Sequence, residues 1–283
     1  LLSATNATKI VAIKWQVPIP SAPTAAWSLY QTDKPDIDWR YRTGAGNYNY
    51  VPNVTYAPFG KIDGQSLAAY GSTGSNVDHP ANVTNNMIAL AQSYTSAFSV
   101  SMTRAWNPTG GPNAAVNLTV NIQATAPYSA TSNSLVFRTV LVERVINFSV
   151  QPGTNGEKDF YDAARGVFPT TAGIPLAQTW TVGQTQTFTM TCALPSYIIK
   201  KSEVAFVGFI QNDVTQKVEQ SVRADKQPVP YDANAISAYA NPVCSGTFAP
   251  LVTVKNDGAS AITNMTITPY VDGVVGNTTS WSG

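Results

Sequence analysis

From residue 98 onward, apolar and polar side chains alternate along much of the chain. Phe98, Val100 and Met102 are separated by serines, and the segment VNLTVNIQ at 116–123 repeats the pattern. A period of two predicts antiparallel strands with one buried face and one wet face. Further strands are expected at 135–146, 179–194 and 203–212, which together indicate a β-sandwich. The stretch 204–210 is apolar on both faces, which predicts a central strand.

The residues before this region follow a different pattern. Residues 9–15 form a short apolar run, which predicts a buried parallel strand. A short helix is expected at 36–42 and a longer helical stretch at 80–97, where a proline suits the first turn. Between them, residues 57–64 contain a proline, and the residues after it predict a strand and a tight turn. We therefore expect a mainly β chain with a small α/β part.

The last sixty residues predict a second, smaller β region. Residues 225–243 contain several prolines and small residues, which favour a linker. A strand, a turn and a second strand are then expected at 248–255, 256–258 and 262–271, and Asp272-Gly273 offers another turn before a third strand. Three strands are too few to bury a sandwich core. This region is therefore expected to need further residues or a partner.

The composition is typical of a secreted β-protein. Only 12% of residues are charged, whereas 13 tyrosines, 10 phenylalanines and 6 tryptophans provide aromatic side chains. The net charge of +1 gives no reason to expect nucleic acid or an anionic membrane as a partner. No apolar run reaches the roughly 18 residues that a membrane span needs.

The residues that usually carry catalysis are scarce. One histidine, His79, cannot build a zinc site or a Ser-His-Asp set without partners, and none clusters near it. We therefore predict no catalytic residue, no metal and no cofactor. The two cysteines are Cys192 and Cys244. Cys192 shares a strand face with apolar residues, so it is either a core residue or one half of a Cys192–Cys244 disulfide.

Aromatic side chains are concentrated in the first fifty residues. Exposed aromatic rings can stack on sugars or anchor protein contacts, and buried ones would instead cover the core of this region. All three roles remain open from the sequence. The candidate binding residues are Trp15, Trp27, Tyr30, Trp39 and Tyr41.

The middle of the chain resembles a known family. The segments FRTVLVERVI at 137–146, FYDAARGVF at 160–168, TWTVG at 179–183 and the stretch 204–220 are similar to the β-sandwich half of the twenty-eight-kilodalton outer-membrane-protein family of Bacteroidetes. In that family the sandwich follows a thioredoxin-like domain. The resemblance implies that residues 1–97 are a partial thioredoxin-like domain and that Pro58 matches its cis-proline. The family's C-x-x-C redox helix is missing here, so no redox activity is expected.

The tail resembles the start of a CARDB-like adhesion module, which is common in Bacteroidetes proteins exported by type IX secretion. The predicted organisation is a partial thioredoxin-like domain at 1–97, an immunoglobulin-like β-sandwich at 98–224, a linker at 225–243, and a partial second sandwich at 244–283.

These observations predict a non-catalytic structural or adhesion protein that is extracellular or associated with the outer membrane. It would be part of a larger modular protein, or a subunit of a filament in which copies complete each other's domains. Its partners would be proteins or copies of itself. The alternative is a carbohydrate- or envelope-binding module that uses the aromatic residues to hold surface glycans.

Overall fold

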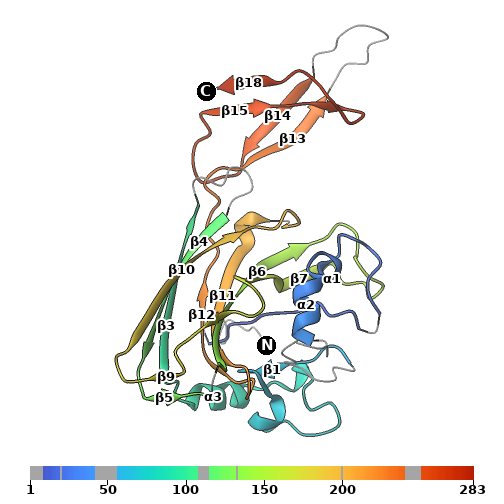
Figure 1. Cartoon of the computed structure of the whole chain (residues 1–283). Helices are drawn as coiled ribbons and strands as arrows, with labels where there is room; N and C mark the ends of the chain where they lie inside the picture. The colour runs from blue at the N-terminus through green and yellow to red at the C-terminus, as the bar shows by residue number, and fades with distance from the viewer. Residues whose placement is uncertain are drawn as a thin grey trace. The chain divides into compact units, whose positions relative to one another are not determined.

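The structure is a computed structural model that describes residues 9–19, 21–41, 56–107, 115–131, 133–198, 200–239 and 250–283. The chain forms two compact units, which we call unit 1, up to Gln227, and unit 2, from Pro228 to Gly283. Figure 1 shows both units, with most of the strands in unit 1 and the short helices near its N-terminal end. The predicted mainly β fold with a small helical part is confirmed.

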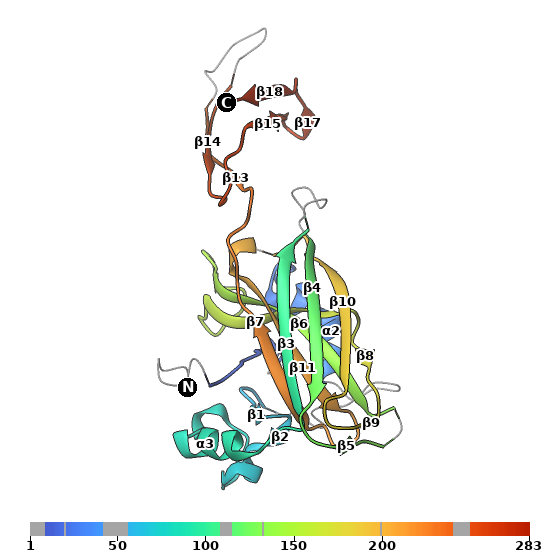
Figure 2. The same cartoon turned by 90° about the vertical axis from the view of Figure 1, so that its left-hand side faces the viewer.

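One sheet of unit 1 has three antiparallel strands. β3 (Phe98–Trp106), β4 (Ala115–Ala124) and β10 (Thr185–Ala193) lie in the order β10-β4-β3. Figure 2 shows the three strands side by side. Their register is uninterrupted, so the polar residues of all three strands share one face. The alternation of apolar and polar residues that predicted these strands therefore reflects a sheet with one apolar face and one polar face.

The second sheet contains the strands that are buried on both faces. Its order is β12-β11-β6-β7, and β8 also pairs with β6. Both faces of β11 are buried, which confirms the predicted central strand. The strands are β6 (Leu135–Asn147), β7 (Asp159–Phe168), β8 (Ile174–Pro175), β11 (Val204–Asn212) and β12 (Val218–Ala224).

The main core lies between these two sheets. Leu118 and Ile122 of β4 pack with Phe137 of β6 and Phe206 of β11, and Trp180 lies in the same cluster. The two sheets therefore form the predicted β-sandwich. The strand expected at 179–194 is two strands, β9 (Thr179–Trp180) and β10, because a turn at Gly183 separates them. β9 pairs with β5 (Tyr128–Ser129).

The N-terminal segment covers the other face of the larger sheet. Val11, Ile13 and Trp15 pack with Trp39 on a cluster of buried strand residues such as Val207. The predicted strand at 9–15 is wrong as a full strand: its residues make one parallel bridge, from Lys14 to Ala163. These side chains cover a sheet that is already formed, so the apolar run does not require pairing along its length.

The remaining elements of unit 1 are short. Helices α1 (Leu29–Thr32) and α2 (Lys34–Tyr41) lie close to the predicted 36–42 helix. The stretch 80–97 contains a 3-10 turn at Pro80–Asn82 and helix α3 (Asn85–Ser93). The hairpin of β1 (Lys61–Ile62) and β2 (Gln65–Ser66) is followed by a 3-10 turn, Leu67–Tyr70, and another 3-10 turn, Lys201–Glu203, precedes β11.

The boundary predicted between residues 97 and 98 does not separate compact units. The β1–β2 hairpin contacts the turn between β11 and β12, where the Val218 amide donates to the Asp63 carbonyl at 2.8 Å. The residues before β3 are therefore part of unit 1. The peptide bond before Pro58, the position matched to a cis-proline, is cis. The thioredoxin-like assignment of this part rests on the sequence resemblance.

The described residues of unit 2 form three two-stranded antiparallel sheets: β13 with β14, β15 with β18, and β16 with β17. The predicted linker at 225–243 is wrong for residues 233–239, because they form β13 and pair with β14. The strand expected at 262–271 is divided by Pro269 into β15 and β16. The bounds are β13 (Ala233–Tyr239), β14 (Leu251–Asn256), β15 (Asn264–Ile267), β16 (Tyr270–Val271), β17 (Val274–Val275) and β18 (Thr279–Ser282).

Candidate functional site

The five candidate binding aromatics do not form one exposed platform. Tyr30 and Trp39 are buried, which fits the core-covering role among the three left open by the sequence, since a buried ring is not available for stacking on a ligand. Trp15 and Tyr41 are half-buried. Trp27 is exposed, and its ring centroid lies 5.2 Å from that of Phe148. These positions favour packing over ligand binding for most of the group.

Cys192 lies on the core side of β10 and is fully buried. Burial raises the pKa of its thiol to about 12, which disfavours the thiolate form that reacts. No disulfide joins it to another described residue. Cys244 lies outside the described residues, so the Cys192–Cys244 pairing stays a prediction.

A buried charged cluster fastens helix α1 to the sheet. The Arg165 guanidinium is 3.0 Å from a carboxylate oxygen of Glu143. It also donates to the Thr32 hydroxyl at 3.1 Å and to the Tyr197 carbonyl at 3.2 Å. Arg165 is the additional residue of a bulge in β7, since Val142 pairs with Ala164 and the next pair is Leu141 with Gly166. The bulge therefore aims this arginine at the helical segment.

Asp33 belongs to the same cluster. Burial, helped by the nearby charge of Asp36, raises the pKa of Asp33 to about 7, although Arg165 and Tyr197 oppose the rise. The Tyr197 hydroxyl donates to the Asp33 carboxyl at 3.4 Å. Asp36 accepts the Val167 amide at 2.7 Å, and burial raises its pKa as well. A carboxyl that titrates near neutrality is a possible acid or base, but its partners here all hold the fold together.

A surface pocket of about 410 Å³ lies beside β7. Its charged groups are largely satisfied by one another: Arg144 is 2.7 Å from Asp162, and Lys226 is 2.7 Å from Glu203. Within the described ranges, no three histidine, cysteine, aspartate or glutamate residues are placed to hold a metal ion.

Unit 2 carries the most unusual surface. Its strands place apolar residues directly opposite one another, and many of these side chains are exposed. Among the described residues of unit 2, Val229 alone is buried. We call the following the apolar pairs of unit 2: Tyr239 with Leu251, Met265 with Trp281, Tyr270 with Val275, and Val271 with Val274. They are our candidate interaction site.

The sequence predicted strands at 248–255 and 262–271 and an incomplete core in this region. Which apolar residues face each other depends on the hairpin register, and the pattern alone does not give that register. The buried arginines of unit 1 had a signal too, since Arg138 interrupts the apolar run at 135–142.

In the part of the chain that the structure describes, no helix is both long and apolar enough to cross a bilayer. No family model matches the sequence, and no curated protein matches it either. Solved structures do show similarity. HBP35 of Porphyromonas gingivalis has 9% identity and a TM-score of 0.47, over 92% of this chain and 83% of that one.

A domain of the outer membrane lipoprotein Omp28 from Porphyromonas gingivalis has 13% identity and a TM-score of 0.30, over 47% of this chain and 90% of that one.

Proposed function

We propose that this chain is a non-catalytic structural or adhesion protein of the cell surface, and that unit 2 makes its contact with other copies of the chain. The observation that carries the proposal is the exposure of the apolar pairs of unit 2. Leu251 is 70% exposed and Val274 is 71% exposed, although both lie on paired strands.

Isolated two-stranded sheets are marginally stable in water, and unit 2 consists of three of them. A further strand from another chain would bond to a free sheet edge, and a further face would cover the apolar pairs. Burying one valine- or leucine-sized side chain contributes about 1.5–3 kcal/mol. Covering several pairs at once is therefore enough to support a contact between chains.

The composition supports a location outside the cell. The 12% share of charged residues and the high content of threonine and aromatic residues are typical of secreted β-proteins. Export by type IX secretion follows only from the sequence resemblance and is part of the proposal. A contact between copies that does not close on itself would build a filament.

Bead clumping tests this proposal, because many weak contacts between coated beads act together. Beads would carry either the full-length chain or the variant Leu251→Ser/Val274→Ser. The matched control is Val182→Ser/Val214→Ser, which changes two valines of unit 1 that are 64% and 69% exposed.

We expect wild-type and control beads to clump and the unit-2 variant to stay dispersed. Clumping that is equal in all three, or wild-type beads that do not clump, would overturn the proposal. Circular dichroism of each variant would establish that the strands remain folded.

A further inference from the structure

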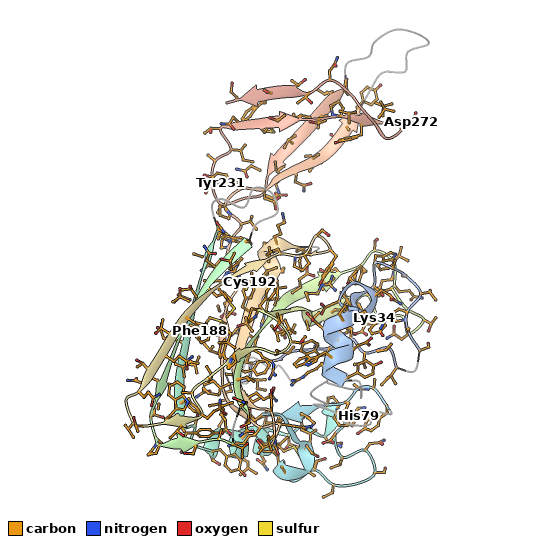
Figure 3. All side chains as sticks on the ribbon, in the orientation of Figure 1. Lys34, His79, Phe188, Cys192, Tyr231 and Asp272 are labelled. Atoms are coloured by element: carbon orange, nitrogen blue, oxygen red, sulfur yellow. The ribbon has the colours of Figure 1, made fainter. Side chains whose placement is uncertain are left out.

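β10 forms an open edge of the three-stranded sheet. It pairs with β4 on one side. Among the described residues, no backbone hydrogen bond joins Thr185–Ala193 to any segment other than β4. The backbone N–H and C=O groups along the edge that faces away from β4 are therefore available to another strand. Figure 3 labels Phe188 and Cys192, which lie on this strand.

The edge lacks the features that usually prevent pairing. Proteins protect edge strands with charged residues, prolines, bulges or short length. The sequence TQTFTMTCA is nine residues long, and it has no charge and no proline. Its register with β4 is continuous from Thr185 to Ala193, so no bulge bends it away.

The two faces of β10 are chemically distinct. Thr185, Thr187, Thr189 and Thr191 are exposed on the outer face. Two of them are held in place by β4: Thr187 donates to Asn121 at 2.7 Å, and Thr191 donates to Asn117 at 2.9 Å. A strand that pairs here would therefore meet an ordered row of hydroxyl groups.

The opposite face of β10 is apolar and incompletely covered. Phe188 and Met190 pack against the main core but are only half-buried, and no described strand pairs beyond this edge. The ring of Phe188 is 5.2 Å from that of Phe137. A neighbouring strand with its own apolar residues on this side would extend the core past the edge.

We propose that β10 pairs antiparallel with β10 of a second copy, centred on Thr189. This register overlaps the strands over their whole length. It places Thr189 opposite Thr189 and Thr187 opposite Thr191 on the outer face, and Phe188 opposite Met190 on the core face. A two-fold axis perpendicular to the sheet produces this arrangement and yields one six-stranded sheet.

A second copy fits this edge better than an unrelated strand because the pattern is symmetric. From residue 187 to residue 191, each face of β10 meets side chains of its own kind, whereas Gln186 meets Cys192 and Thr185 meets Ala193 toward the ends. Cross-strand threonine pairs and apolar pairs both stabilise antiparallel sheets. A slip by one residue would place threonines opposite apolar residues, so the alternation also fixes the register. The contact involves unit 1 and does not depend on the function proposed for unit 2.

A cysteine crosslink tests the pairing directly. In the variant Thr189→Cys, the two new thiols would meet at the two-fold axis, where opposed Cα atoms are about 4.5–5.5 Å apart and within disulfide range. The control is Thr103→Cys, which lies in the same row of the same face but on β3. Both variants carry Cys244→Ser. We expect covalent dimers from the first variant alone after mild oxidation. No dimer, or equal dimer in both, would overturn the proposal.

Charge substitutions test the register. The variant Thr187→Lys/Thr191→Lys places like charges opposite each other, whereas Thr187→Lys/Thr191→Glu places opposite charges there. In sedimentation velocity, we expect the first to lose the dimer and the second to keep it. If both behave alike, the register is wrong. Adding Leu251→Ser/Val274→Ser should leave the Thr189→Cys crosslink intact, which separates this contact from the one proposed for unit 2.

Discussion

The buried pair of Arg138 and Asp213 offers the clearest test of what holds unit 1 together. The guanidinium of Arg138 donates two hydrogen bonds to the carboxylate of Asp213, at 2.7 and 2.8 Å. It also donates to the carbonyl of Thr171 at 2.7 Å and lies 5.1 Å from the ring centroid of Trp39. One side chain of β6 thereby holds two loops and helix α2 in place.

The variant Asp213→Ala would leave this guanidinium buried without its counter-charge. The side chain of Arg138 is 0% exposed and that of Asp213 is 5% exposed. Removing one partner of such a pair destabilises a protein by about 3–5 kcal/mol. Since domains are stable by roughly 5–15 kcal/mol, we expect unit 1 to lose a large part of its free energy of unfolding.

The matched control is Asp225→Ala, which removes a 63% exposed aspartate from an ion pair with Arg223. Exposed pairs contribute about 0–1 kcal/mol, so this variant should unfold like wild type. Urea unfolding followed by tryptophan fluorescence and by circular dichroism measures both variants.

A loss below about 1 kcal/mol for Asp213→Ala, or equal losses in the two variants, would refute the reasoning. A third variant, Arg138→Met/Asp213→Leu, removes both charges. It should recover much of the stability, since apolar replacement of a whole buried pair is often neutral.

Three further predictions concern single positions. The raised pKa of Asp33 means that the folded state binds a proton between pH 3.8 and about 7, so stability falls as pH rises through this range. Asp33→Asn should weaken this fall and stabilise the chain above about pH 7, as urea unfolding at several pH values would show; an unchanged pH profile would contradict this. Gly173→Ala should destabilise by about 1–3 kcal/mol, because φ is +75° and a Cβ would lie 2.7 Å from the Phe137 carbonyl oxygen. Gly183→Ala, where an added Cβ would have open space around it, should lose less stability, as thermal unfolding of both variants would show. In a Cys244→Ser background, Cys192 should react with a thiol reagent only after unfolding, and rapid labelling of the folded chain would show that it is accessible.

Much of the sandwich could be predicted from the sequence, because its strands have one wet face. The alternation at 116–123 identifies β4, and the doubly apolar stretch at 204–210 identifies β11 as central. These patterns follow directly from burial on one face or on both. The strands can therefore be recognised from the local sequence, without knowing what packs against them.

The errors arise where burial depends on a distant partner. Residues 233–239 are all exposed and five of the seven are alanine, serine or asparagine, so no alternation distinguished β13 from a linker. Tyr30 and Trp39 are aromatic in a segment rich in prolines and charges, and only the sheet beneath them explains their burial. The charged groups Arg138 and Arg165 are buried by loops and helices from other parts of the chain, which no local pattern encodes.

The covering of the larger sheet by the N-terminal segment has a consequence for biosynthesis. Trp15 packs on a cluster that includes Phe209, nearly two hundred residues later in the chain. At roughly 5–20 residues per second, about 10–40 seconds of translation separate these two residues. During that interval the apolar N-terminal segment has no surface to bind. The N-terminal segment therefore lacks its final packing surface until β11 has been made, so this layer of unit 1 is completed late in synthesis.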